Sequence, residues 1–302
     1  MTWPAIMTAL LTPYDEYGEV DADKAAALAL HLWGQGCGGF VVAGSTGEAY
    51  GLSLIERERL FRAVRFALPD DVLVLVGTGH QDTRQAVRLT EAAHSWGADG
   101  MLVVAPYYNK PPQRGLVAHF VEVACHTDRP IMVYDVPGRT GVRVAPETVL
   151  EAHQHAANIV AVKEAAGTIT DLIAMHRALS DDITLYSGDD GLLLPGLAVG
   201  AVGVVSVASH VATRPMVDLV NAFHAGRCRE ALALHEALWP LSQALFYDTS
   251  PIPLKWLMNR LGWAVGGVRP PLTMPSDADD LSALWQAFQR LGLEQAMRRR
   301  LA

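Results

Sequence analysis

Eight short, almost wholly apolar runs recur along this chain and constrain its fold more than any other feature. Each is rich in β-branched residues and lacks the polar and apolar alternation of a half-exposed strand. Such runs are typical of parallel strands that are covered on both faces. They span residues 5–10, 39–42, 72–76, 101–104, 131–134, 159–162, 183–186 and 202–207.

Segments with helical periodicity separate these strands. The clearest start signal is a capping box, Ser53 with Glu56, and Asp82 and Gly97 are placed to begin and end the next helix. Strand starts lie roughly 20 to 34 residues apart, the length of one βα unit. Eight such units favour a (β/α)8 TIM barrel, an α/β fold, over an open sheet. No Gly-x-Gly-x-x-Gly follows the first strand, which counts against a dinucleotide-binding fold.

The pattern changes near Gly226, after the eighth unit. Helical periodicity continues over residues 228–247, 253–261 and 279–300 without further strands. We therefore predict a catalytic barrel domain over residues 1–226 and a C-terminal helical subdomain over residues 227–302.

Charge and hydropathy exclude several classes of protein. Lys and Arg total 24 against 32 Asp and Glu, a formal net charge of −8, which argues against nucleic-acid or anionic membrane partners. Residues 191–213 carry no charged side chain, but Pro195, Gly196, Gly200 and Gly203 interrupt them. A short buried helix followed by a strand is therefore favoured over a transmembrane helix.

Cysteine usage and the amino terminus favour a cytoplasmic protein. Cys37, Cys125 and Cys228 are odd in number and lie in apolar or helical segments, so we expect three buried, reduced thiols. No basic residue precedes Lys24, so the apolar start lacks the charged region of a signal peptide.

The candidate chemistry lies just after the strands, because reactive groups of such barrels gather at the carboxyl ends of their strands. Lys163 ends the sixth apolar run, where burial disfavours the ammonium form and lowers the pKa of the amine. The neutral amine can attack a ketone and form an imine, which then accepts electrons from the adjacent carbon. The alternative is a structural ion pair with Glu164 or another carboxylate at the rim.

Three other strand ends carry polar side chains. After the second strand, Ser45 and Thr46 lie between glycines in a turn that can hold a carboxylate, although such a turn is also ordinary before a capped helix. Tyr108, after the fourth strand, is a proton carrier or simply aromatic packing. After the fifth strand, Tyr134 can pass protons to an imine on the neighbouring strand, and Arg139 can grip a carboxylate.

Six segments together resemble the dihydrodipicolinate synthase family, whose members are also called 4-hydroxy-tetrahydrodipicolinate synthases. They occur in that family's order and spacing across nearly the whole chain, within the pyruvate-aldolase superfamily that includes N-acetylneuraminate lyase. Arg139, in its Arg-Thr-Gly setting, favours the synthase over the rest of the superfamily. The segments are 44–48 (GSTGE), 106–109 (PYYN), 134–141 (YDVPGRTG), 162–165 (VKEA), 187–190 (SGDD) and 251–255 (PIPLK).

The resemblance implies the catalytic roles. Lys163 would form the imine with pyruvate, and Tyr134 would be the central proton carrier. Thr46 would link Tyr134 to Tyr108, which would be inserted from a neighbouring subunit. The reaction would be the condensation of pyruvate with L-aspartate-4-semialdehyde, on the diaminopimelate route to L-lysine.

The resemblance also implies the binding groups and the assembly. Ser45 and Thr46 would hold the pyruvate carboxylate, and backbone atoms of Val205 would complete that pocket. Arg139 would bind the carboxylate of the semialdehyde. Members of the family work as homotetramers, typically pairs of tight dimers, without metal or organic cofactor.

The chain departs from the family at three positions near the site. Asp135 replaces the common Asn after the strand-five tyrosine, Ser45 replaces Thr, and Ser250 replaces Asn. Asp135 keeps a hydrogen-bonding side chain but adds a negative charge, while Ser45 keeps a hydroxyl. These changes leave the imine chemistry intact.

The allosteric site of feedback-inhibited members also differs. Leu54 and Arg57 stand where such sites use histidines, Gln85 replaces a carboxylate suited to an ammonium group, and only Tyr107 is as expected. We therefore predict weak or absent inhibition by L-lysine. The remaining positions of this site are Ala49, Tyr50 and Gln81.

Two other functions remain open. A pyruvate aldolase that acts on a sugar acid or another 2-oxo acid would share Lys163 and Tyr134 but would not need Arg139. A barrel that only binds a 2-oxo acid, as a sensor or assembly partner, would need no chain of proton carriers. The synthase is the leading hypothesis.

Overall fold

A closed barrel of eight parallel strands confirms the predicted (β/α)8 fold. The computed structural model describes residues 3–179, 181–276 and 279–297. Each of the eight apolar runs overlaps one strand, and neighbouring strands in the chain are neighbours in the barrel. The strands are β1 (Ile6–Ala9), β2 (Gly39–Val42), β3 (Leu73–Gly77), β4 (Gly100–Val104), β5 (Ile131–Asp135), β6 (Ile159–Glu164), β7 (Thr184–Ser187) and β8 (Gly203–Ser206).

Helices follow the strands as the sequence predicts. The capping box is formed: the Ser53 hydroxyl accepts from the Glu56 N–H, and the Glu56 carboxylate accepts from the Ser53 N–H at 2.7 Å. Gly97 ends its helix in the left-handed region, at φ 89°. The helices between strands are α1 (Ala22–Gly34), η1 (Ala49–Gly51), α2 (Leu54–Ala67), α3 (Thr83–Trp96), α4 (Gln113–Cys125), α5 (Pro137–Thr140), α6 (Pro146–His155), α7 (Ile169–Ala178), η2 (Asp190–Leu192) and α8 (Leu193–Ala198).

The chain after β8 is helical. It comprises α9 (Ser209–His224), α10 (Cys228–Ala244), α11 (Ile252–Arg260), α12 (Ser282–Arg290) and α13 (Glu294–Met297). The last predicted helix, over residues 279–300, is thus two shorter helices, and residues 298–300 lie outside the described residues.

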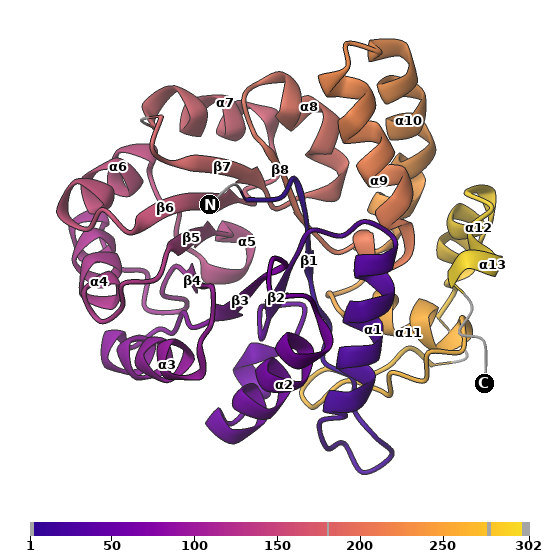
Figure 1. Ribbon diagram of the computed structural model, residues 1–302, viewed down its shortest axis with the longest axis horizontal. Coiled ribbons are helices and arrows are strands. Elements are labelled where there is room, and N and C mark those ends of the chain that lie inside the picture. Colours follow the sequence, from indigo (N-terminus) through magenta and orange to yellow (C-terminus); the bar gives the residue numbers. More distant parts are fainter. Residues whose placement is uncertain (1–2, 180, 277–278, 298–302) are drawn as a thin grey trace. The chain divides into compact units, whose positions relative to one another are not determined.

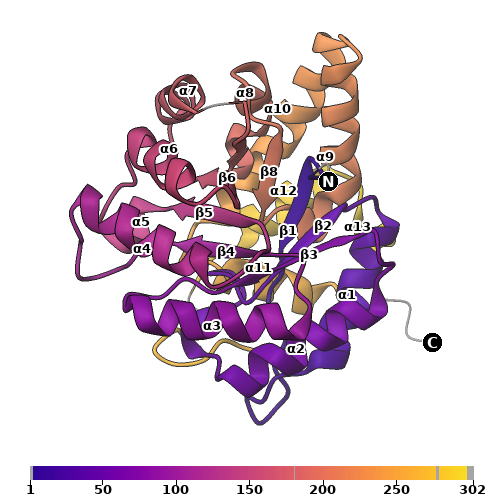
Figure 2. The ribbon, with the colours of Figure 1, turned by 60° about the vertical axis from the view of Figure 1, so that its left-hand side comes forward.

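The chain forms two compact units. One runs from Leu73 to Val205 and includes the start of the chain up to Ala5; the other consists of Ile6–Val72 and the chain from Ser206 onward. In the first unit, α3, α4, α6 and α7 succeed one another on the outer side of strands β4 to β7 (Figures 1 and 2). In the second, α10 packs beside α9, and α1 packs against α2 (Figure 1). The predicted domain boundary at residue 226 falls between α9 and α10, and that division stays a prediction.

The core explains why the strand sequences are continuously apolar. All residues of β1, β2 and β3 are buried, as are those of β5. Burying one Val, Leu or Ile side chain stabilises the fold by about 1.5 to 3 kcal/mol. In a strand that is covered on both faces, side chains on either face can contribute this stabilisation. A sequence that alternated polar and apolar residues would instead bury polar groups on one face.

Two sequence predictions about burial have different outcomes. Residues 191–213 contain a short helix, α8, followed by β8, as predicted. No helix within the described residues is both long enough and apolar enough to cross a bilayer. The three thiols are free, but only Cys37 is buried. The prediction is wrong for Cys125 and Cys228, because they end α4 and begin α10, where helix termini reach solvent.

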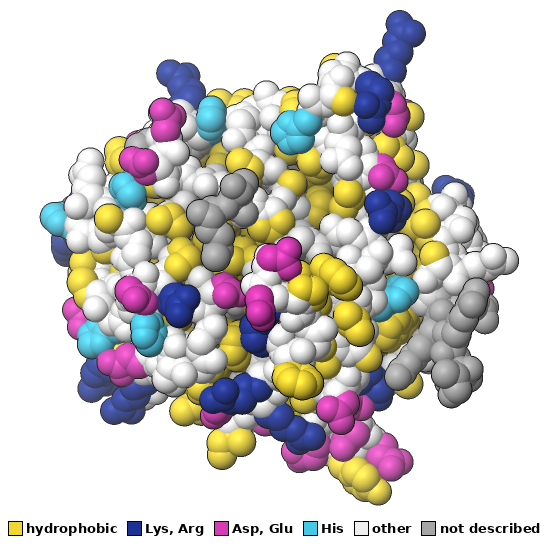
Figure 3. Space-filling model, in the orientation of Figure 1, with side chains coloured by type: hydrophobic (Ala, Val, Ile, Leu, Met, Phe, Trp, Pro, Cys, Tyr) yellow, Lys and Arg dark blue, Asp and Glu magenta, His cyan; other side chains and the backbone are white. Residues whose placement is uncertain are grey.

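Charged side chains are mixed over the surface that Figure 3 displays. Lys and Arg side chains stand among Asp and Glu side chains there and form no broad basic area.

Candidate active site

Lys163 and Tyr134 lie side by side on neighbouring strands. The parallel register of β5 and β6 pairs these two residues directly, so their side chains leave the same face of the sheet. Both are buried, at 5% and 6% exposure. The Lys163 Nζ lies 4.3 Å from the centroid of the Tyr134 ring. The strand pairing alone thus places a phenol next to a buried amine.

The environment of Lys163 favours its neutral, nucleophilic form. Burial lowers the pKa of Lys163 to about 8; the nearby Asp190 carboxylate acts in the opposite direction, and Arg139 lowers the pKa further. With a pKa of about 8, about one tenth of the molecules carry a neutral amine at pH 7. A lysine with the ordinary pKa of 10.5 would be neutral in a far smaller fraction of molecules at this pH.

Two residues after β7 complete the surroundings of Lys163. A Cβ at Gly188 would lie 2.9 Å from the Lys163 Cε and 2.5 Å from the Ala165 Cβ, so only glycine leaves room for the lysine. Asp190 is 5% exposed, and its negative charge acts on Lys163. The sequence analysis gave neither residue a role, although both follow the end of a strand, where such groups gather.

The other predicted residues of this unit surround the same end of the barrel strands. Arg139 lies in α5, directly after β5, and its charge acts on Lys163. Val205 is fully buried on β8. Tyr108 follows β4, is 87% exposed and has the left-handed φ of 74°. Its N–H donates to the Thr140 carbonyl at 3.2 Å, which ties the loop after β4 to the loop after β5.

The segment with Ser45 and Thr46 belongs to the other compact unit. Thr46 is 5% exposed and Ser45 is half-buried. A Cβ at Gly47 would lie 2.9 Å from the Leu10 carbonyl oxygen, and the Thr12 hydroxyl donates to the Gly47 carbonyl at 2.6 Å. This turn therefore packs tightly on the end of β1 and needs a glycine there.

A buried ion pair fixes the end of the same turn. Glu48 has a left-handed φ of 54°, and its Oε1 accepts from the Lys255 Nζ at 2.6 Å. Its Oε2 accepts from the Arg269 N–H at 3.0 Å. The Lys255 ammonium also donates to the Gly267 carbonyl at 2.6 Å and lies 4.1 Å from the centroid of the Tyr14 ring. The helical region after β8 thus supports the loop that follows β2.

The described residues contain no cluster of three or more His, Cys, Asp or Glu side chains that could hold a metal ion. The reacting groups that lie side by side in the first unit are the Lys163 amine and the Tyr134 phenol. A barrel with a buried, partly neutral lysine beside a tyrosine at the carboxyl ends of its strands has the constellation of a Schiff-base aldolase.

Comparison with known proteins places the chain within that class. The model of the dihydrodipicolinate synthetase family matches residues 3–289. The chain belongs to this family, which confirms the predicted family and the predicted type of lyase.

Named relatives agree with the family. A 4-hydroxy-tetrahydrodipicolinate synthase of Parasynechococcus marenigrum is 49% identical over 287 residues, which cover 95% of this chain and 94% of the relative. The crystal structure of the dihydrodipicolinate synthase from Cyanidioschyzon merolae, with lysine bound, has a TM-score of 0.93 and 41% identity, covering 96% of this chain and 98% of that one. A monomeric dihydrodipicolinate synthase variant has a TM-score of 0.92 and 34% identity, covering 96% and 97%.

Proposed function

We propose that this chain condenses pyruvate with L-aspartate-4-semialdehyde, as a 4-hydroxy-tetrahydrodipicolinate synthase on the diaminopimelate route to L-lysine. The observation that carries the proposal is the buried Lys163 beside Tyr134, in a chain whose named relatives are synthases. The strand register puts the amine and the phenol together, and burial makes the amine nucleophilic.

The reaction begins at the Lys163 amine. Its nitrogen attacks the pyruvate ketone, and loss of water leaves a protonated imine. Tyr134 transfers a proton from the pyruvate methyl group, and the resulting enamine carbon attacks the aldehyde, whose oxygen takes up a proton. The amino group of the semialdehyde then attacks the imine carbon, closes the ring and releases the free amine of Lys163.

Four further residues hold the substrates in this proposal. Ser45 and Thr46 bind the pyruvate carboxylate through hydroxyls and backbone N–H groups, and the backbone at Val205 closes that side of the pocket. Arg139 binds the carboxylate of the semialdehyde through its planar guanidinium. Thr46 also continues the path of protons from Tyr134 to Tyr108.

The proposed assembly is a cytoplasmic homotetramer in which Tyr108 reaches into a neighbouring subunit. Two features of Tyr108 support this: its ring is 87% exposed, and its backbone is held in a left-handed conformation at the tip of a loop. One relative of known structure is a monomeric variant of a dihydrodipicolinate synthase. That a monomer is singled out as a variant supports a larger assembly for other members of the family.

Arg139→Ala separates the proposed function from its nearest rival. Losing a charge-assisted hydrogen-bond pair should raise KM for the semialdehyde about 10- to 100-fold and change KM for pyruvate less than about threefold. Steady-state kinetics with both substrates varied measures this. Arg114→Ala, which removes an exposed arginine of α4, is the control and should leave both constants near wild type.

An Arg139→Ala enzyme with an unchanged KM for the semialdehyde would contradict the assignment of the second substrate. The next assay would then supply pyruvate with sugar-acid precursors, as the rival aldolase requires. A binding protein without turnover would show no activity with either set of substrates.

We also expect weak or absent inhibition by L-lysine. Arg57 is 6% exposed, and its guanidinium donates to the backbone carbonyls of Ala49 and Leu52, so it supports its own turn. Gln85 offers no negative charge to an ammonium group. At about 1 mM L-lysine we expect less than about twofold loss of activity, whereas strong inhibition would contradict the prediction. The Cyanidioschyzon merolae enzyme, whose crystal structure contains bound lysine, is assayed in parallel for comparison.

A further inference from the structure

Asp135 and Glu164 form a second cross-strand pair directly after Tyr134 and Lys163. The register of β5 and β6 sets Asp135 opposite Glu164, as it sets Tyr134 opposite Lys163. Successive residues of a strand face opposite sides, so the carboxyl pair lies on the face away from the amine and the phenol. The two carboxyl side chains are 0% and 2% exposed.

Each carboxyl group has one satisfied and one unsatisfied oxygen. The Asp135 Oδ1 accepts from the Val144 N–H at 3.1 Å, and the Glu164 Oε1 accepts from the Ala166 N–H at 2.6 Å. Among the described residues, the Asp135 Oδ2 and the Glu164 Oε2 are buried and have no hydrogen-bond partner. A buried carboxylate oxygen without a donor is costly, so these two oxygens need a shared explanation.

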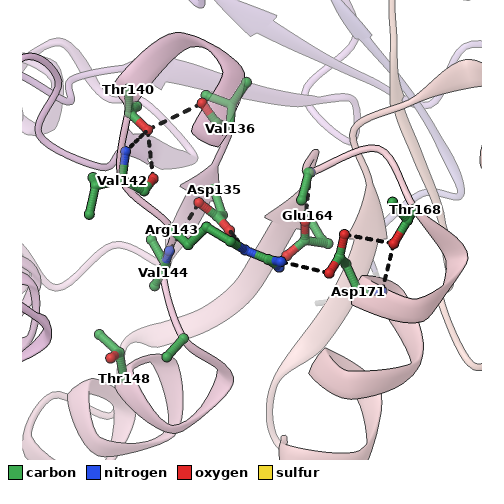
Figure 4. Close-up of polar contacts among 12 residues, drawn as sticks. Asp135, Val136, Thr140, Val142, Arg143, Val144, Thr148, Glu164, Thr168 and Asp171 are labelled. Atoms are coloured by element: carbon green, nitrogen blue, oxygen red, sulfur yellow. Dashed lines mark hydrogen bonds and ion pairs between the residues drawn. The ribbon is translucent and has the colours of Figure 1, made fainter. Parts of the chain in front are cut away.

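The charges around the pair do not balance two carboxylates. Figure 4 shows the Arg143 guanidinium reaching in from the segment between α5 and α6, with Asp171 of α7 on its far side. The Arg143 Nη1 pairs with the Asp171 Oδ1 at 2.7 Å, whereas its Nε is 3.9 Å from the Asp135 Oδ2. Arg143 is half-exposed and is shared by three carboxyl groups. Full ionisation would leave an excess of negative charge.

Titration of the two groups follows from this crowding. Burial raises the pKa of Asp135 to about 6 and that of Glu164 to about 7; the Asp135 charge also raises the pKa of Glu164, and Arg143 lowers both. Adjacent buried carboxyls of this kind lose their protons as a coupled pair. Between about pH 6 and pH 7, the pair therefore holds about one proton.

We propose that Asp135 and Glu164 share one proton between Oδ2 and Oε2, and that this bond joins the ends of β5 and β6 and holds Tyr134 and Lys163 in register. Both residues are then positioning residues of the reaction, and the inference rests on the proposed function only for its effect on activity. An Asn at position 135 would carry neither the negative charge nor the titrating proton of Asp135.

The shared proton is tested first without any substrate. In protein labelled with 13C at the glutamate carboxyl, the Glu164 resonance is assigned from its absence in Glu164→Gln. We expect it to titrate near 7 in the wild type and at a lower pH in Asp135→Asn, because the like charge is gone while burial still holds the pKa of Glu164 above its ordinary value. Titration near 4.5 in the wild type, or near 7 in both proteins, would overturn the shared proton.

The positioning role is tested by the pH dependence of kcat. Loss of the proton lets two buried carboxylates repel each other at the ends of the strands that carry the reacting groups. We expect the ratio of kcat at about pH 8.5 to kcat at about pH 6.5 to be about fivefold lower in the wild type than in Asp135→Asn. Lys163 titrates in both proteins, so its contribution cancels in this comparison.

The two readouts separate the inference from the proposed function. Equal pH ratios in the two proteins, with the expected NMR shift, would overturn the positioning role while leaving the shared proton. A protein without synthase activity but with the expected NMR titration would overturn the proposed function, not the shared proton.

Discussion

Replacing Lys163 with methionine should lower kcat by on the order of 1,000-fold or more, because the substitution removes the buried amine beside Tyr134 that forms the imine in the proposed reaction. Methionine has a similar length and suits a site that is 5% exposed, so the fold should persist. Turnover in the coupled assay and the circular dichroism of the variant are the measurements.

The matched control is Lys24→Met. Lys24 of α1 pairs at 2.8 Å with Asp21, the residue that caps this helix, and such a partly exposed ion pair is worth about 1 kcal/mol or less. We expect this variant to keep wild-type activity. A folded Lys163→Met enzyme with more than about a tenth of the wild-type kcat would remove the imine from the mechanism.

Replacing Lys255 with methionine should lower the free energy of unfolding by about 3 to 5 kcal/mol. The substitution leaves the fully buried Glu48 carboxylate without its cation, although the Arg269 N–H at 3.0 Å remains. Glu48 also holds a left-handed φ of 54° that the ion pair stabilises. For a chain of this size we expect the apparent Tm to fall by roughly 10 °C, measured by calorimetry.

A double substitution tests whether the ion pair itself is responsible. Glu48→Leu combined with Lys255→Met removes both charges, so most of the lost stability should return. A double variant as unstable as the sum of the two single variants would contradict this explanation. Because Thr46 lies two residues before Glu48, we also expect a higher KM for pyruvate in Lys255→Met.

The barrel could be predicted from the sequence because burial on both faces leaves a direct mark on strand composition. Each apolar run overlaps its strand, and most strand ends differ from the prediction by one or two residues. Lys163 was expected just after its strand and instead lies within β6, since the parallel pairing continues to Asp135 and Glu164. The same parallel pairing places Tyr134 beside Lys163, as the sequence predicted.

Partners distant in the sequence could not be predicted in the same way. Glu48 and Lys255 are 207 positions apart, and nothing in either segment specifies the other. Gly188 and Asp190 were noted in the sequence only as parts of a family motif, without a role. Their effect on Lys163 depends on distances between atoms, which the sequence does not give. The two exposed cysteines were misjudged because a helical pattern in the sequence does not show which of its residues lie at a helix end that reaches solvent.

The most direct measurement is borohydride reduction of the protein with pyruvate, followed by mass mapping of the modified peptide. The chain has four lysines, Lys24, Lys110, Lys163 and Lys255, so the map is unambiguous. Burial lowers the pKa of both Lys163 and Lys255 to about 8, but Lys255 is held by Glu48. We predict a single adduct on Lys163. An adduct elsewhere, or none while a known aldolase is trapped in parallel, would contradict the imine mechanism.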